Sequence, residues 1–272
     1  LIRYLMRHRH TTPFEMVEFK FHCKMPIFVA RQWVRHRTAN INEYSLRYSE
    51  ARDEFYFPDP DNIEFQSALN KQGRMGEVDS KLKHKVQKYF KEISQRSFEI
   101  YSELNEAGVA RELARAILPV NLYTEWYWKN DLHNLLHFIG LRSDGHAQYE
   151  IRVFSDAMAS FVKKVAPFAW EAYQDYAVKG MRFSKIEQIF LQKKLPDRVI
   201  DDIQEDVAYQ LTASLHANKP RSDEDLFPLY KDQGGLDGPE DFSLKWSSGE
   251  IETGNVRELR EFKSKIESLR QA

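Results

Sequence analysis

The stretch VEFKFHCKMPIFVARQWVRHR, residues 17–37, changes its hydrophobic period partway along. Over residues 17–23 apolar side chains alternate with charged or polar ones, which is typical of a strand with one buried face. Pro26 ends this run, since proline cannot donate a hydrogen bond inside a sheet. Over residues 27–37 the apolar side chains recur at helical spacing. We therefore predict a strand followed directly by a helix.

Most of the remaining elements are predicted to be helices. The clearest runs from about residue 77 to 107, because its apolar side chains have helical spacing and Gly108 is a typical C-cap residue. Asp131 is predicted to cap a helix over residues 132–141. The other predicted elements are the end of a helix at residues 1–10, a helical turn capped by Thr12, a short strand at 54–57, helices at 110–118 and 146–177, and loops at 38–50 and 61–76.

The chain is predicted to divide into a main domain, residues 1–183, and a C-terminal extension, residues 184–272. In the extension we expect helical pieces over 186–217, a linker rich in Pro, Gly, Asp and Ser over 218–255, and a short charged helix over 256–270. Leucine rather than methionine opens the chain, as if inside a helix. We therefore expect an upstream segment to precede it.

Bulk composition excludes several classes of protein. The 272 residues carry a formal net charge of −1, whereas a protein that coats nucleic acid is strongly basic. The single cysteine, Cys23, excludes an intramolecular disulfide and a cysteine-rich zinc site, and it indicates a reducing, cytoplasmic compartment. Because it falls on the apolar side of the predicted strand, we expect it to be a core residue. No apolar run approaches the roughly 20 residues that span a bilayer, and no signal peptide is visible.

The densest group of chemistry-bearing residues is Arg35-His36-Arg37, followed after seven residues by Ser45. The planar guanidinium group of arginine pairs two-pronged with phosphate oxygens, and a serine hydroxyl can fill a remaining position. Taken alone, the triplet is equally compatible with a solvated basic helix end. With the basic stretch at residues 7–10, it is also compatible with a nucleic-acid-binding module, whose affinity would fall steeply with salt.

The complete pattern of Arg-His-Arg, seven residues and Ser resembles the signature of flavin-dependent thymidylate synthases, the ThyX type. Flanking blocks are similar to that family in order and type, so that the resemblance extends over about residues 1–180. It implies a mixed α/β (α+β) fold with a mixed sheet and long helices, assembled as a homotetramer whose active sites are shared between subunits. The blocks lie at residues 10–15, 26–33, 45–49, 114–119 and 141–151.

The activity that the resemblance implies is the reductive methylation of dUMP to dTMP. Methylenetetrahydrofolate would donate the carbon, and NADPH would supply reducing equivalents through bound FAD. The sequence contains no Gly-x-Gly-x-x-Gly motif, which agrees with a flavin held outside a Rossmann fold. The alternative within the family is a truncated or decayed homologue that folds and binds FAD but makes no dTMP.

The resemblance also implies which residues form the site. Arg142 would lie at the pyrimidine and favour ionisation at N3 of the ring, because a fixed cation stabilises a nearby developing anion. The residues implied to bind dUMP are Gln32, Arg35, Glu43, Tyr44, Ser45, Leu46, Arg47, Arg115 and Arg142. The residues implied to bind FAD are Thr12, Arg35, His36, Arg37, Glu43, Asp131, His133 and His137.

A metal site is the alternative interpretation of His133 and His137. The two histidines are four residues apart on one predicted helix face, and Asp131 or His146 could complete a ligand set. Two histidines at this spacing are frequent by chance, and no glutamate follows the first as it does in zinc peptidases. We therefore expect flavin contacts here and no metal.

Aromatic residues offer stacking surfaces for a flavin or a folate. Trp33 is one candidate, and Trp126, Tyr127 and Trp128 form a cluster further along. We expect this cluster to lie on an apolar helical stretch. Its members are then expected to pack in the core rather than to contact a ligand.

Overall fold

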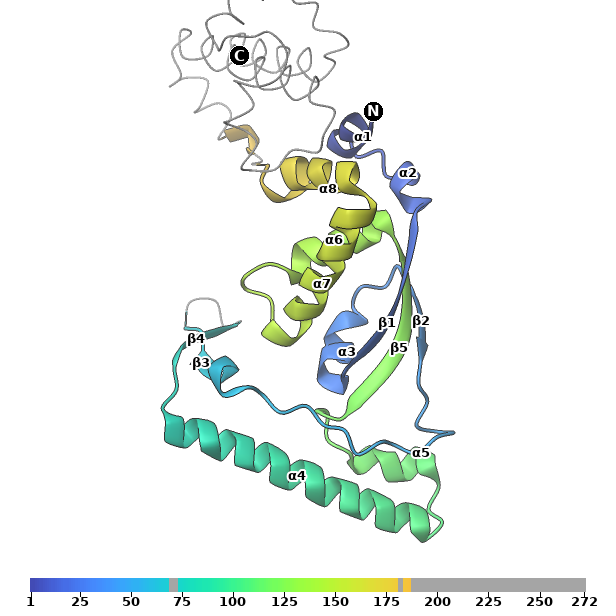
Figure 1. Cartoon of the computed structure of the whole chain (residues 1–272), viewed down its shortest axis with the longest axis vertical. Coiled ribbons are helices and arrows are strands. Elements are labelled where there is room, and N and C mark those ends of the chain that lie inside the picture. Colours follow the sequence, from blue (N-terminus) through green and yellow to red (C-terminus); the bar gives the residue numbers. More distant parts are fainter. Residues whose placement is uncertain (69–72, 181–182, 187–272) are drawn as a thin grey trace, which may run out of the picture. The chain divides into compact units, whose positions relative to one another are not determined.

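The computed structural model describes residues 1–68, 73–180 and 183–186 (Figure 1). The chain forms two compact units: His10–Lys164 is the larger, and Leu1–Arg9 with the residues from Val165 onward is the smaller. The predictions made for residues beyond 186, namely helical pieces, a linker and a charged helix, lie outside the described residues. Among the described helices, none is long and apolar enough to cross a membrane.

A three-stranded antiparallel sheet is the centre of the larger unit. Strand β5 (Tyr123–Asp131) lies between β1 (Glu18–Pro26) and β2 (Asn40–Glu43). β1 pairs with β5 along its whole length, and β2 pairs with the other edge of β5. β1 and β2 therefore run in the same direction, joined by helix α3 (Ile27–Trp33), with β5 inserted between them.

This sheet confirms the mixed α/β composition and corrects one part of the prediction. The sequence predicts a mixed sheet, but every strand pair among the described residues is antiparallel. The reason is topological: β1 and β2 would form a parallel pair only as neighbours, and β5 occupies the place between them. The predicted strand before Pro26 and the helix after it are both present.

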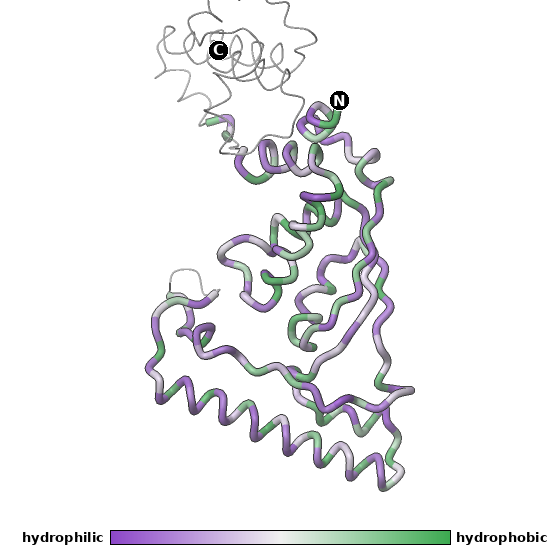
Figure 2. Tube along the Cα trace, in the orientation of Figure 1, coloured by the Kyte–Doolittle hydropathy of each residue, from purple (hydrophilic) through white to green (hydrophobic). Residues whose placement is uncertain are grey.

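Helix α4 spans Ser80–Glu106, close to its predicted bounds. Asp79 is its N-cap, and Gly108 follows it at φ +80°, a conformation that glycine adopts without strain. Figure 2 shows this helix as predominantly hydrophilic. One of its buried side chains, Tyr101, accepts a hydrogen bond from the Ala51 amide at 2.8 Å, which joins the helix to the segment that follows β2.

The helices after β5 also follow the prediction. Asp131 caps α6 (Leu132–Arg142) by accepting a hydrogen bond from the Asn134 amide at 2.8 Å. Helix α7 spans Tyr149–Val165. Before β5, the predicted helix at residues 110–118 is present as α5 (Arg111–Ala114) and a 3₁₀ turn (Arg115–Ile117).

Strand β5 presents its residues alternately to two faces of the sheet. Trp126 and Trp128 are 1% and 0% exposed, whereas Tyr127 between them is 48% exposed. The prediction of a helix here is wrong, because the buried and exposed residues alternate with the period of two of a strand. The core prediction is confirmed for the two tryptophans and wrong for Tyr127, which stacks on His22 of β1 at a centroid distance of 4.6 Å.

Trp33, the last residue of α3, is the centre of the packing on the inner face. Its buried ring meets the rings of Trp126 and Trp128 edge-on, at centroid distances of 5.5 and 5.3 Å. Phe138 of α6 stacks on it at 4.9 Å, and Phe154 of α7 lies at 5.5 Å. These five residues are the aromatic core. Through them α3, α6 and α7 cover the same face of the sheet (Figure 1).

Three further segments differ from the prediction. The helix expected over residues 27–37 ends at Trp33, so the arginines after it lie in a turn. The loop expected over residues 38–50 contains β2, whose side chains are all exposed and therefore have no apolar period. The loop expected over residues 61–76 contains a 3₁₀ turn (Pro60–Asn62) and a hairpin of β3 (Glu64–Gln66) and β4 (Arg74–Glu77).

Two short elements are corrected in detail. The strand expected at residues 54–57 is reduced to a single bridge between Phe55 and Leu122. Helix α2 (Thr12–Glu15) has Thr11 at its N-cap position, where the sequence predicts Thr12, and no side chain caps it. Both elements are too short for a period to define their ends.

The smaller unit has its own contacts. Helix α1 (Ile2–Arg7) carries Arg3, which donates hydrogen bonds to Glu171 of α8 (Pro167–Tyr173) at 3.0 Å and to the Tyr176 hydroxyl at 2.9 Å. The same guanidinium group pairs with Asp175. Together these contacts attach the first helix of the chain to α8 and the π-helical turn that follows it.

Candidate active site

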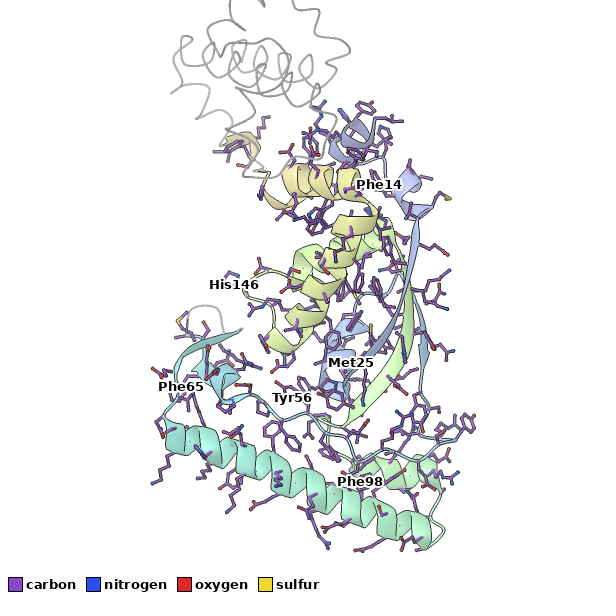
Figure 3. All side chains as sticks on the ribbon, viewed as in Figure 1. Phe14, Met25, Tyr56, Phe65, Phe98 and His146 are labelled. Atoms are coloured by element: carbon purple, nitrogen blue, oxygen red, sulfur yellow. The ribbon has the colours of Figure 1, made fainter. Side chains whose placement is uncertain are left out.

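A pocket of about 990 Å³ lies between the β3–β4 hairpin and the junction of α6 with α7. This volume is at the upper end of the roughly 300–1,000 Å³ typical of small-molecule and cofactor sites. Figure 3 shows His146 on the α6–α7 loop and Phe65 on the hairpin. The lining is mainly polar and consists of Gln32, Asn62, Glu64, Gln66, Gly73, Arg74, Gly140, Leu141, Arg142, Asp144, Gly145, His146, Ala147, Gln148, Tyr149 and Arg152.

Arg142, the last residue of α6, is held in this pocket by a histidine from the predicted signature. Its Nε donates a hydrogen bond to Nε2 of His36 at 2.9 Å. Burial, together with the charge of Arg142 and the proximity of His137, lowers the pKa of His36 from 6.5 to about 4. His36 is therefore neutral at neutral pH, with Nε2 as the acceptor. The remaining guanidinium nitrogens of Arg142 have no partner among the described residues.

Gln32 of α3 brings an unpaired acceptor to the same pocket. Its side-chain Oε1 is buried and has no hydrogen-bond partner within the described part of the chain. A buried polar atom without a partner costs free energy, on the order of 1–3 kcal/mol. A ligand that donates a hydrogen bond at this point would remove that cost. The structure thus brings together three predicted residues: Gln32, His36 and Arg142.

Arg35 and Arg37 flank His36 in the turn after α3. Both side chains are exposed, and neither forms an ion pair or a hydrogen bond within the described residues. Two unpaired guanidinium groups next to a neutral imidazole fit a ligand that carries phosphates. The arrangement therefore fits the implied flavin dinucleotide, although these two side chains do not line the pocket of Arg142.

The segment from Glu43 to Arg47 is attached to β5 and lies outside that pocket. Glu43 accepts a 2.7 Å hydrogen bond from the Thr124 hydroxyl, and the Tyr44 amide donates to the Glu125 carbonyl at 2.9 Å. Arg47 pairs with Glu112 at 3.3 Å, and its amide donates to the Ser45 hydroxyl at 3.4 Å. Tyr44 and Leu46 line a separate hollow of about 20 Å³.

The predicted nucleotide ligands are consequently divided between two places in one chain. Gln32 and Arg142 line the large pocket, whereas Tyr44 lines the small hollow and bonds to β5, and Ser45 and Arg47 line neither. Arg35 is exposed in the turn that follows α3. Arg115, in the 3₁₀ turn after α5, lines neither hollow.

The other residues predicted to bind flavin are dispersed. Both carboxylate oxygens of Asp131 are used in capping, since they accept from the amide and the side chain of Asn134 at 2.8 Å. His137 lies near His36, with ring centroids 6.0 Å apart. Thr12 is exposed in α2, and His133 is half-buried in α6. Among the described residues no group of three His, Cys, Asp or Glu side chains could hold a metal ion.

Several residues that line the pocket were not among the predicted site residues. Asn62, Gln66 and Arg74 come from the hairpin region, and Gln148 and Arg152 come from the junction of α6 with α7. The one local signal was a pair of glycines flanking the first residues of β4, both of which adopt positive φ. Polar side chains in a short hairpin carry no apolar period that would single them out.

A family model and the sequence relatives indicate the same protein family. A family model described as "Thymidylate synthase complementing protein" matches residues 1–168. Flavin-dependent thymidylate synthase from Rickettsia prowazekii (strain Madrid E) is 52% identical over 198 residues, which cover 68% of this chain and 67% of the relative. Its counterpart from Ehrlichia ruminantium (strain Gardel) is 55% identical over 185 residues, which cover 68% and 62%. Thus the match spans about three-fifths to two-thirds of the length of these relatives.

Solved structures agree with the sequence relatives. A UMP/dUMP methylase from Streptomyces cacaoi bound with 5-Br UMP is 34% identical, with a TM-score of 0.62 over 64% of this chain and 82% of that one. The same methylase bound with 5-Br dUMP gives a TM-score of 0.59 at 34% identity, over 64% and 77% of the two chains. Given the family match, the relatives and these structures, the chain belongs to the family of flavin-dependent thymidylate synthases.

Proposed function

We propose that this protein methylates dUMP to dTMP, with methylenetetrahydrofolate as the carbon donor and NADPH as the reductant, through bound FAD. The observation that carries the proposal is the pocket of Arg142, in which an oriented guanidinium group faces the same space as the unpaired acceptor of Gln32. The relatives are flavin-dependent enzymes and a structural neighbour was solved with a dUMP analogue, which supports both the flavin and the pyrimidine nucleotide.

Arg142 is the residue that acts on the pyrimidine. Methylation at C5 requires electron density on the ring, and loss of the N3 proton supplies it as a negative charge. The guanidinium group stabilises that charge, most strongly where water is excluded. His36 fixes its orientation before the substrate arrives, because the Nε hydrogen bond leaves the other guanidinium N–H groups available. Gln32 accepts a hydrogen bond from a donor group of the ligand.

The flavin is held by the turn after α3. Arg35 and Arg37 provide charge for its phosphates, and His36, being neutral, adds no repulsion between the two arginines. When bound, the reduced flavin supplies the hydride that completes the new methyl group. Thr12, Glu43, Asp131, His133 and His137 are the further flavin ligands in this proposal.

A complete site requires a second copy of the chain. Ser45 and Arg47, which bind the dUMP phosphate in this proposal, do not line the pocket of Arg142, and Arg47 pairs with Glu112 of α5. A neighbouring subunit can offer the loop of Glu43, Tyr44, Ser45, Leu46 and Arg47 to that pocket. The assembly we propose is a homotetramer with shared active sites, in which Arg115 is another ligand of the nucleotide.

The test is an absorption spectrum of the full-length protein with FAD, titrated with dUMP and followed by an assay for dTMP. We expect bound flavin, a shift of its spectrum on addition of dUMP, and turnover once NADPH and methylenetetrahydrofolate are present. A flavin spectrum that shifts without any dTMP would indicate a homologue that has lost activity. Absence of flavin binding, with salt-sensitive binding of nucleic acid instead, would contradict the proposal in favour of a nucleic-acid-binding module.

A further inference from the structure

A buried carboxylate lies directly behind the pocket without lining it. Glu150, the second residue of α7, is 4% exposed. Both of its oxygens accept hydrogen bonds from Nη2 of Arg74, at 2.6 and 2.7 Å. The Tyr56 hydroxyl donates to it at 2.8 Å and the Gln148 side chain at 3.0 Å. Its acceptor capacity is therefore used by three different segments of the chain.

Glu150 is ionised at neutral pH despite its burial. Burial alone would raise the pKa of the carboxyl group, but the hydrogen bonds from Arg74 and Tyr56 outweigh this effect and lower the pKa. A charged acceptor makes these hydrogen bonds stronger than neutral ones. The group is thus a fixed negative charge with directional partners.

Two partners of Glu150, Arg74 and Gln148, line the pocket from two different segments of the chain. Arg74 begins β4, and its Nη1 also donates to the Asn62 carbonyl at 2.8 Å, within the hairpin region. Gln148 belongs to the α6–α7 loop. Asn62, Arg74 and Gln148 all line the pocket. The two segments approach each other closely at Gly73, where an added Cβ would lie 3.7 Å from the His146 carbonyl oxygen.

The carboxylate is in turn attached to the body of the larger unit. The Tyr56 amide donates to the Asn121 carbonyl at 2.8 Å, and the Asn121 side chain donates to the Tyr56 carbonyl at 3.0 Å. Asn121 also donates to the Ser94 hydroxyl of α4 at 2.9 Å. The chain of contacts from α4 through Tyr56 to Glu150 therefore gives the hairpin a rigid point of attachment.

We infer that Glu150 is a positioning residue, which holds Arg74 and with it the β3–β4 hairpin against the α6–α7 loop, and so fixes the width of the substrate pocket. A buried ion pair contributes little net stability, because desolvation offsets the attraction. Its effect here is geometric: it orders the hairpin before a ligand binds. The identity of that ligand rests on the proposed function, whereas the restraint on the hairpin does not.

Loss of the charge should therefore weaken binding more than chemistry. In Glu150→Gln the side chain keeps its shape, but Arg74 loses the negative charge that it pairs with. The hairpin therefore loses the contact that holds it in place. We expect KM for dUMP or for methylenetetrahydrofolate to rise about tenfold, while kcat changes by less than about threefold, because a group that preorganises the ground-state pocket acts through binding. Hydrogen exchange in β3 and β4 should become about tenfold faster, with β1 and β5 unchanged.

The experiment uses the full-length flavoprotein, with Glu150→Gln, Arg74→Lys and their combination. Arg74→Lys is the milder change, since it keeps the charge at a partly exposed position and loses the second hydrogen bond. Glu99→Gln is the matched control, because Glu99 is an exposed carboxylate paired with Arg96 at 3.2 Å on α4. The double variant should differ little from Glu150→Gln, since both changes break one restraint.

The two proposals fail in different ways. If kcat falls while both KM values stay unchanged, if exchange in β3 and β4 is no faster than in Glu99→Gln, or if the two changes add fully, Glu150 does not position the hairpin. If the unaltered protein makes no dTMP, the proposed function fails. The exchange measurement still decides the role of Glu150 in that case.

Discussion

The aromatic core and the pocket wall are both built around α6 and α7, yet different forces hold them. In the aromatic core the indole N–H groups of Trp33, Trp126 and Trp128 are buried and have no hydrogen-bond partner in the described part of the chain, so packing fixes the rings. In the pocket wall, Arg74 is fixed by hydrogen bonds of 2.6 and 2.7 Å to the buried carboxylate of Glu150 behind it. The core therefore tolerates unsatisfied polar atoms because close packing holds it, whereas the wall depends on directional hydrogen bonds.

The largest effect is expected from emptying the aromatic core. Trp33→Ala should lower the free energy of unfolding by about 3–5 kcal/mol, since a large buried ring is removed and its neighbours cannot close the cavity. Denaturant unfolding measures the change. Trp33→Phe is the control, because it keeps most of the stacking with Phe138 and should cost clearly less. A loss below about 1 kcal/mol for Trp33→Ala would show that the core does not depend on this ring.

The next effect concerns activity rather than stability. Arg142→Ala should lower kcat for dTMP formation by about 10²–10³-fold, the usual cost of removing a group that stabilises developing charge. Unfolding free energy should change by less than about 1 kcal/mol, because the side chain is half-exposed and its one described hydrogen bond is to His36. Arg142→Lys retains the charge and loses the orienting contact with His36. Its kcat should therefore lie between those of Arg142→Ala and the unaltered protein. Equal kcat for Arg142→Ala and the unaltered protein would contradict the role at the pyrimidine.

The same contrast explains what the sequence could predict. Hydrophobic period identified β1 and the start of α3, Gly108 identified the end of α4, and Asp131 identified the start of α6. These features are local, so a short window of sequence contains them. β2 was missed because its four residues are all exposed, and it is a strand only because the edge of β5 pairs with it.

The candidate site was predicted in part, for a related reason. The signature residues and Arg142 were found through the resemblance, and the contact of His36 with Arg142 was not, since it joins residues 106 positions apart. Arg74 in the pocket wall and Glu150 behind it are polar and distant in sequence, and nothing local marks them as partners. Trp126 and Trp128 were placed in the core correctly but on the wrong element, because an aromatic run is compatible with either period.

A smaller effect is expected from pH, acting through His36. The pKa of His36 is about 4 in the folded protein, compared with its ordinary value of 6.5. Between these pH values the unfolded chain therefore binds more protons than the folded one. Stability should therefore fall as pH falls from 6.5 to 4, by roughly 1–3 kcal/mol from this group. Protonation also places a second cation beside Arg142. The difference between the unaltered protein and His36→Gln, measured by denaturant unfolding at pH 7 and pH 4.5, isolates the contribution. An identical pH dependence in both would contradict it.

The smallest effect is expected at Cys23, on the buried face of β1. We ask whether its thiol is protected by packing, as the side chains of the core are. Burial in β1 raises the pKa of the thiol from 9.0 to about 11, so almost no thiolate exists at pH 8. A thiol reagent should leave the native protein unmodified and should modify it fully in denaturant. Cys23→Ala should keep kcat within about twofold and cost on the order of 1 kcal/mol of stability, because only one buried sulfur is removed. Rapid modification of the native protein would show that the thiol is accessible, and loss of turnover in Cys23→Ala would show that the site depends on it. Either outcome would contradict the assignment of Cys23 to the packed core.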